Sequence, residues 1–146
     1  MSRDRQTKAS NRGRSASRSA RGGAGSISEL DRLRGEVAAI GRSQAVIEFD
    51  LDGTIRDANE NFLKTMGYTL DEIVGQHHSL FAPPGHSQTR EYKAFWEKLG
   101  RGEYDAGEYK RIGKGGREVW IRASYNPIFD RAGRPFKVVK YATDVT

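Results

Sequence analysis

Two aspartates near the start of the apolar part of the chain have the types and spacing needed for phosphoryl transfer. Asp50 and Asp52 follow a strand-like run, V-I-E-F (46–49), within the string D-L-D-G-T. In such a pair the first carboxylate attacks phosphorus, the second moves a proton, and Mg²⁺ neutralises the phosphate oxygens. An Asp followed by Gly is also a common β-hairpin turn, so the same residues have a purely structural interpretation.

The string is similar to the signature of haloacid-dehalogenase-like phosphotransferases. That chemistry needs a parallel α/β sheet that also supplies a Ser or Thr after a second strand, a Lys, and a late acidic pair. Residues after 57 do not show repeated β-α-β units, and they contain no late D-D or G-D-x-x-x-D string. We therefore expect no enzyme activity, and a phosphatase using Asp50 and Asp52 is kept only as a remote alternative.

The other candidates for chemistry are three histidines and one tryptophan. His77, His78 and His86 are all the histidines of the chain. An imidazole can ligate heme iron, which His86 or His78 would do, but a histidine more often caps a turn or lies at the surface. Three histidines at this spacing, without any cysteine, are a poor zinc set. The indole of Trp96 can stack on a flat cofactor or simply fill a core.

Residues 43–146 predict one α+β domain that would position these side chains. Five runs alternate apolar and polar residues and end at turn residues: 45–51, 54–57, 104–112, 118–129 and 136–143. Short helices are predicted at 61–66, at 69–75 (opened by the capping box T-L-D-E) and at 90–99. The last three strands have connections too short for parallel crossovers, so helices should cover one face of an antiparallel sheet.

This order of elements resembles the PAS fold. Three blocks carry the resemblance: 58–76 (A-N-E-N-F-L-K-T-M-G-Y-T-L-D-E-I-V-G-Q), 114–128 (K-G-G-R-E-V-W-I-R-A-S-Y-N-P-I) and 134–146 (R-P-F-K-V-V-K-Y-A-T-D-V-T). The string G-Q-H-H-S-L-F (75–81) and the Phe95–Trp96 pair are similar to PAS domains of bacterial chemoreceptors and aerotaxis receptors. The resemblance implies a PAS fold with a five-stranded antiparallel sheet and short helices on one face.

The resemblance also implies a sensory function, in which a small ligand or cofactor binds and its state is relayed through flanking helices or a partner. The cofactor would be FAD or heme, or none. Residues that would contact it are Trp96, His78, His86, His77, Tyr125 and Asn61. In flavin-binding aerotaxis receptors a tryptophan at the matching place lies at the cofactor.

Several of these residues have competing interpretations. His86 or His78 would be a metal ligand only for heme, with Tyr125 or Trp120 as the distal group. PAS oxygen sensors that hold heme from the long helix would need a histidine near position 91, and none is there. Local backbone capping is the favoured role of Asn59 and Asn61. A cluster of basic residues is interpreted as a solvated strand edge and turn: Lys110, Arg111 and Lys114.

Residues 26–42 predict an N-terminal amphipathic helix. Ser26 and Glu29 form a capping box, and the apolar residues that follow lie on one stripe: Ile27, Leu30, Leu33, Val37 and Ile40. The stripe can pack on its own domain or pair with a second copy, and the sequence leaves both open. We expect a homodimer and a signalling output protein, such as a chemoreceptor or histidine kinase region. A ligand-free dimerisation module is the alternative function.

Residues 1–25 predict a disordered basic tail. They contain seven basic residues against Asp4 alone, and so account for the whole net charge of +6. Nucleic acid binding is therefore expected at most weakly, through this tail. No run of about 18 apolar residues and no signal peptide occurs, and there is no cysteine, so we expect a cytoplasmic protein without a membrane span.

Overall fold

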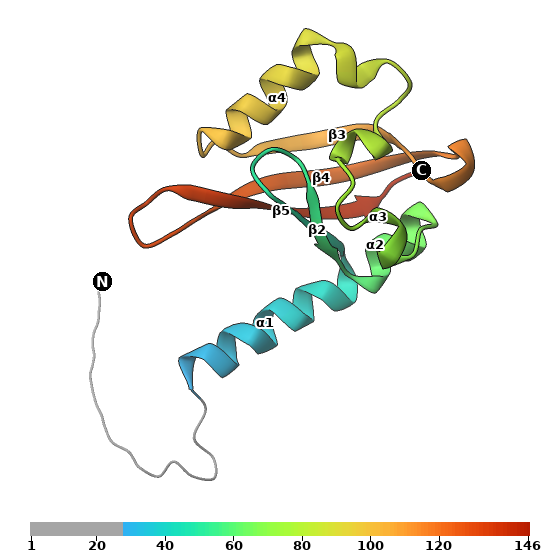
Figure 1. Cartoon of the computed structure of the whole chain (residues 1–146). Coiled ribbons are helices and arrows are strands. Elements are labelled where there is room, and N and C mark those ends of the chain that lie inside the picture. Colours follow the sequence, from blue (N-terminus) through green and yellow to red (C-terminus); the bar gives the residue numbers. More distant parts are fainter. Residues whose placement is uncertain (1–27) are drawn as a thin grey trace. The chain divides into compact units, whose positions relative to one another are not determined.

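The structure, a computed structural model, describes residues 28–146 of the chain (Figure 1). Its helices and strands are α1 (Glu29–Ser43), β1 (Ala45–Phe49), β2 (Ile55–Ala58), α2 (Glu60–Met66), α3 (Leu70–Ile73), α4 (Arg90–Gly100), β3 (Asp105–Ile112), β4 (Glu118–Phe129) and β5 (Pro135–Asp144). Three short 3₁₀ turns were not predicted: η1 (His78–Phe81), η2 (His86–Gln88) and η3 (Lys114–Gly116). The predicted disordered tail, 1–25, lies outside the described residues.

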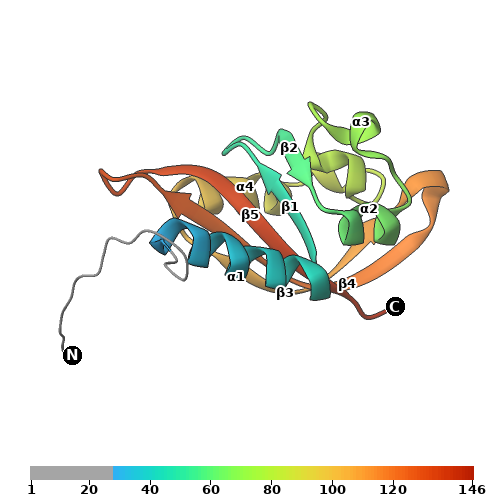
Figure 2. The same ribbon diagram turned by 90° about the horizontal axis from the view of Figure 1, so that it is seen from below.

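The five strands form one sheet in the order β2-β1-β5-β4-β3, and every neighbouring pair is antiparallel. The C-terminal strand β5 lies at the centre of the sheet, between β1 and β4 (Figure 2). This confirms the predicted α+β architecture. In the register of the central strands, Lys140 on β5 pairs with Ile47 on β1 and with Tyr125 on β4. These three residues therefore share one row across the middle of the sheet.

The core lies on the face of the sheet that carries this row. On β4 the buried residues alternate as predicted: Val119, Ile121, Ala123 and Tyr125. Helix α4 crosses above the strands (Figure 1) and contributes three buried side chains, Tyr92, Trp96 and Leu99. Helix α2 adds Phe62 and Met66. The interior is rich in aromatic rings, and these rings position the polar groups of the site.

Asn59 explains where α2 begins and how the start of β1 is fixed to the residues just before it. Its side-chain oxygen accepts hydrogen bonds from the backbone N–H of Phe62 (3.0 Å), as a helix N-cap, and of Val46 (2.9 Å). Its amide donates to the carbonyls of Gly41 (3.1 Å) and Gln44 (3.0 Å). The predicted capping box that opens α3, Thr69 with Glu72, is confirmed.

Helix α1 starts later than predicted. The Oγ atom of Ser28 accepts a hydrogen bond from the backbone N–H of Asp31 (3.0 Å), so Ser28 caps a helix that begins at Glu29. Ser26 and Ile27, which were predicted to start the helix, lie outside the described residues. The apolar stripe is present, and its members are between 38% and 63% exposed: Leu30, Leu33, Val37 and Ile40.

The D-L-D-G-T string forms the turn between β1 and β2. The backbone N–H of Asp50 donates to the carbonyl of Thr54 (2.8 Å), and Asp52 Oδ1 accepts from the Thr54 N–H (2.9 Å). The carboxylate of Asp50 pairs with Arg56 (2.8 Å). Because every described strand pairing is antiparallel, the parallel sheet that the remote phosphatase hypothesis requires is missing from residues 28–146. The string is a hairpin turn.

None of the helices described between residues 28 and 146 combines the length and apolar composition of a membrane span.

Candidate functional site

His77 is a structural residue that holds the η1 turn against the β1–β2 hairpin. Its Nδ1 atom accepts a hydrogen bond from the backbone N–H of Ser79 (3.0 Å). The Nε2 atom therefore carries the proton and donates to the carbonyl of Asp52 (2.8 Å). This close approach requires Gly53, because a Cβ atom there would lie 2.6 Å from His77 Nε2. Both ring nitrogens of His77 are thus engaged within the fold.

His78, the next residue, is fully buried at the centre of the domain. Its Nδ1 lies 2.7 Å from the hydroxyl of Tyr92 on α4, and its Nε2 lies 3.0 Å from the hydroxyl of Tyr125 on β4. The same Tyr125 oxygen accepts two hydrogen bonds from Arg111, from Nη2 at 3.0 Å and from Nε at 3.3 Å. These four side chains form one continuous chain of hydrogen bonds, Tyr92–His78–Tyr125–Arg111.

The donors of this chain fix the tautomer of His78. Since Arg111 occupies the lone pairs of the Tyr125 oxygen, Tyr125 must donate its own O–H to Nε2 of His78. Nδ1 of His78 then carries a proton and donates it to the Tyr92 oxygen. Burial, with a smaller effect of the positive charges of Arg111 and Lys140, lowers the pKa of His78 well below its ordinary value. His78 is therefore a neutral imidazole that both donates and accepts.

Burial also keeps both tyrosines of the chain protonated. It raises the pKa of Tyr92 to about 12, and it raises the pKa of Tyr125 in spite of the neighbouring Arg111. Edge-to-face contacts hold the rings in place, with ring centres 4.8 Å apart for Phe95 and Tyr125 and 5.3 Å apart for Phe49 and His78. The site is therefore a rigid set of neutral hydrogen-bonding groups within an aromatic shell.

Two cations complete the site, and the predicted surface position of Arg111 is wrong. Arg111 is only 5% exposed, because it is the partner of Val119 in the β3–β4 register and so points to the buried face. Lys140 is 1% exposed, and its ammonium lies 4.9 Å from the ring centre of Tyr125. The guanidinium of Arg111 lies 4.9 Å from the ring centre of Tyr109. The basic groups of Arg111 and Lys140 thus each lie over the face of an aromatic ring.

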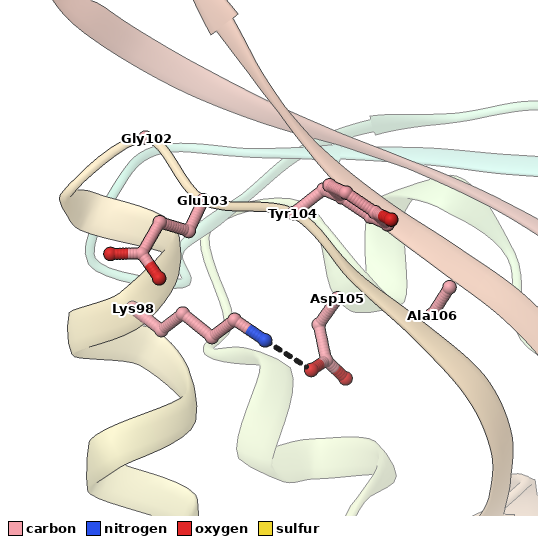
Figure 3. A pocket seen from close by; sticks show the side chains of 6 residues that line it. All are labelled: Lys98, Gly102, Glu103, Tyr104, Asp105 and Ala106. Carbon is pink, nitrogen blue, oxygen red and sulfur yellow. Dashed lines mark hydrogen bonds and ion pairs between the residues drawn. The ribbon is translucent and has the colours of Figure 1, made fainter.

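A second polar group lies where α4 ends and β3 begins, around a hollow of about 540 Å³ (Figure 3). Lys98 pairs with Asp105 (2.9 Å), which also accepts a hydrogen bond from the Tyr109 hydroxyl. Burial would raise the pKa of Asp105, but the hydrogen bonds from Tyr109 and Lys98 outweigh it and lower the pKa. Asp105 is thus an ionised carboxylate whose counterion is Lys98.

A groove of about 430 Å³ lies between α4 and the β1–β2 turn. Its lining includes Leu51, Asp52, His77, Tyr92, Trp96 and Glu97. Trp96 Nε1 is the one buried side-chain nitrogen or oxygen within residues 28–146 that has no hydrogen-bond partner. It lies close to the Tyr92 hydroxyl without forming a bond of regular geometry. A buried donor without an acceptor is costly, and a bound molecule can supply the acceptor.

The structure brings most of the predicted site residues together. Trp96 and His77 line the groove, and His78 and Tyr125 lie behind it. The His86 ring packs edge-on against the Tyr92 ring, with centres 5.5 Å apart.

Two of the predicted residues lie elsewhere. The Asn61 amide donates to the carbonyls of Gly41 and Gln44, as Asn59 does, and Asn61 does not line the groove. Trp120 is 44% exposed on the other face of β4, so the suggestion that it could be a distal heme group is wrong.

His78 is not available as an axial ligand of heme iron. An axial ligand needs a free imidazole nitrogen, and both nitrogens of His78 are already hydrogen-bonded to tyrosines. Aromatic rings fill the space around His78. No group of three side chains suited to a metal ion occurs among the described residues. A flat aromatic cofactor matches the groove better, because the groove lining includes the Trp96 indole.

Sequence reasoning missed three residues of the site: Tyr92, Arg111 and Lys140. The inward direction of Arg111 was readable from its place two residues after Tyr109 on a strand, but its charge suggested the surface. For Lys140 the signal was its position between Val138 and Ala142, which both lie on the buried face of β5.

Comparison with known proteins gives consistent results. Residues 55–142 match the sequence profile of the PAS fold. The chain is 45% identical over 120 residues to the biofilm dispersion protein BdlA of Pseudomonas aeruginosa, which covers 82% of this chain and 29% of that protein. It is 34% identical over 79 residues to the aerotaxis receptor of Escherichia coli, covering 54% of this chain and 15% of the receptor. The chain thus spans less than a third of either relative.

Among solved structures, the PAS domain of a protein from Colwellia psychrerythraea superimposes with a TM-score of 0.69 at 22% identity. The match covers 80% of this chain and 98% of that domain.

Proposed function

The chain belongs to the PAS-fold family, and we propose that it is a sensory module that binds a small molecule or cofactor in the Trp96 groove and signals its state. In this proposal it is a binding protein rather than an enzyme. The observation that carries the proposal is the hydrogen-bonded chain that joins the groove to the sheet. Tyr92 lines the groove, and its hydroxyl is bonded to His78, which is bonded to Tyr125 on the central part of the sheet.

The hydrogen bonds that link Tyr92, His78, Tyr125 and Arg111 connect the groove physically to η1, β4 and β3. A ligand that moves the Tyr92 ring, or takes its hydroxyl as a hydrogen-bond partner, changes the partner of His78 Nδ1. Because a neutral imidazole must donate at one nitrogen and accept at the other, a change at Nδ1 alters what Nε2 can offer to Tyr125. The effect reaches β4 directly and β3 through Arg111. Binding then shifts the population of two packings of the sheet.

We propose a flavin as the first ligand to test. The groove volume of about 430 Å³ lies within the range of small-molecule sites. An isoalloxazine ring can stack on the Trp96 indole, and its carbonyl oxygens can accept the N–H that now lacks a partner. The similarity to an aerotaxis receptor supports a redox-sensitive ligand.

The test is the absorption spectrum of the chain purified from cells supplied with riboflavin, with Trp96→Phe and Trp120→Phe compared. Both variants remove one indole, but only Trp96 borders the groove. We expect flavin bands in the wild type and in Trp120→Phe, and at least a tenfold weaker flavin affinity in Trp96→Phe. A wild-type protein that neither carries nor takes up flavin would refute the flavin assignment. Equal flavin content in both variants would place the ligand elsewhere.

A second candidate function is dimerisation through α1, supported by the exposed stripe of four apolar residues. Paired α1 helices would bury this stripe and give the sensor a route for its output. Val37→Glu should then convert a dimer to a monomer in light scattering, whereas Arg34→Glu, an exposed charge change on the same helix, should not. A monomeric wild type would exclude this function.

For the remainder of the signalling route we propose a cytoplasmic location and an output region of the chemoreceptor or histidine kinase class. The relatives support the proposed output region, since both are signalling proteins much longer than the matched segment.

A further inference from the structure

The interior of the domain holds two basic side chains, Arg111 and Lys140, that form no ion pair with an acidic side chain within residues 28–146. Arg111 on β3 and Lys140 on β5 lie on either side of β4 and are 5% and 1% exposed. Asp105, the carboxylate whose field reaches Arg111, is already paired with Lys98.

Burying two cations in this way is expensive. Removal of an ion from water has a large free-energy cost, and a desolvated contact with an aromatic ring offsets only part of it. The Phe62 and Tyr125 rings lie near the Lys140 ammonium. Burial, then the charge of Arg111, lowers the pKa of Lys140 well below its ordinary value. The free protein therefore holds Lys140 in an unfavourable environment.

Arg111 presents a pattern of donors that suits an oxyanion. Its Nε and Nη2 groups converge on one tyrosine oxygen, at 3.3 and 3.0 Å, while Nη1 donates to the Lys110 carbonyl. The forked guanidinium matches the two oxygens of a carboxylate or phosphate better than a single phenol oxygen. Tyr125 thus occupies the place where an oxyanion would bind.

We propose that Arg111 and Lys140 form a buried binding site for the anionic group of a ligand, either a carboxylate or a phosphate. The inference rests on the proposed sensory function and names the chemistry that the module recognises. In the bound state the oxyanion takes the donors of Arg111 that now go to Tyr125, and it neutralises Lys140. Entry requires the Tyr92 and His78 side chains to rotate, because they separate the groove from the cations. Binding therefore breaks the Tyr92–His78–Tyr125–Arg111 series of hydrogen bonds, which is also the series proposed to carry the signal.

Melting temperatures of the full chain with simple anions test this. The probes are acetate, succinate and inorganic phosphate, each compared with sodium chloride at equal ionic strength and with the uncharged acetamide and succinamide. We expect carboxylate or phosphate to raise the melting temperature by about 4 °C or more at saturation, and the amides to have no effect. A response to carboxylates alone, or to phosphate alone, identifies the source of the anionic group.

Lys140→Met is the decisive variant, because methionine reproduces the length of the apolar stem of lysine and removes the amino group. Replacing an unpaired buried cation in this way should leave the protein folded and at least as stable as the wild type. It should also abolish the response to anions. Lys137→Met is the control, since Lys137 lies on the same strand but is paired at the surface with Glu48.

Three outcomes would overturn the inference: no anion acting beyond chloride, amides acting as well as carboxylates, or Lys140→Met responding like the wild type. Should Lys140→Met fail to fold, Arg111→Met provides the same comparison. The flavin spectrum and the Trp96→Phe variant report separately on the groove, so the sensory proposal can survive a failure of the anion site.

Discussion

The buried, neutral His78 should make the protein sensitive to mild acid. In the folded state the imidazole cannot easily take up a proton, because it is buried and lies near Arg111, Lys140, His77 and His86. In the unfolded state it titrates with the ordinary value of 6.5. A folded pKa below the unfolded one means that the stability is fully present above pH 6.5 and is lost as the pH falls. Tyr92 and Tyr125, which also contact His78, stay protonated throughout this range.

The magnitude follows from the unfolded pKa alone, as long as the folded pKa lies below the range tested. At pH 5.5, one unit below 6.5, protonation of the unfolded imidazole stabilises the unfolded state by about 1.4 kcal/mol, while at pH 7.5 the effect is close to zero. A variant without the imidazole isolates the contribution of His78.

His78→Gln is that variant, because a side-chain amide can still donate to one tyrosine and accept from the other without titrating. Urea unfolding at pH 7.5 and 5.5 measures the free energy of unfolding of each protein. We expect the wild type to lose about 1.4 kcal/mol more than His78→Gln over this interval. Equal losses would show that His78 is protonated in the folded protein or exposed to water, and the argument for a neutral relay would fail.

Two further changes test how the site is held in place. Asn59→Ala should lower the free energy of unfolding, measured by urea melts, by about 2–4 kcal/mol, because Asn59 makes four hydrogen bonds. Asn61→Ala should cost about half as much, because it loses only amide donors to the same carbonyls. Equal costs for the two variants would contradict this. Gly53→Ala should lower the melting temperature more than Gly75→Ala, since both glycines have positive φ but only at Gly53 would a Cβ meet His77; equal effects would mean that the contact with His77 is unimportant.

Much of the fold was predictable from periodicity and turn chemistry. Alternation in β4 identified the buried face, and the Thr69 capping box placed α3. The central position of β5 was not predictable in this way, because strand order depends on pairings between residues far apart in the chain. The 3₁₀ turns were missed for a local reason. Each turn spans only three or four residues and is closed by one or two local backbone hydrogen bonds, such as Leu80 N–H to the His77 carbonyl (2.9 Å), so it is too short to leave a periodic pattern in the sequence.

The candidate site was only half predictable, and the reason is physical. Trp96 and His78 were identified because aromatic and imidazole groups are commonly found at binding sites. Arg111 and Lys140 were not, because a charged residue on a strand is normally solvated and its burial follows only from strand register. Such residues are conspicuous once a structure places them, since their burial contradicts their chemistry.

The position of Tyr125 explains how a small event in the core can reach the sheet. Its hydroxyl joins the His78 side chain from η1 and the Arg111 side chain from β3, and its backbone lies between β3 and β5. Hydrogen bonds to a charged group contribute about 1.5–3 kcal/mol each. Loss or transfer of the Arg111 bonds therefore changes the energy of the sheet by an amount similar to a typical coupling between sites, about 1–3 kcal/mol. No large movement is needed for a population shift of 5- to 150-fold at such a coupling.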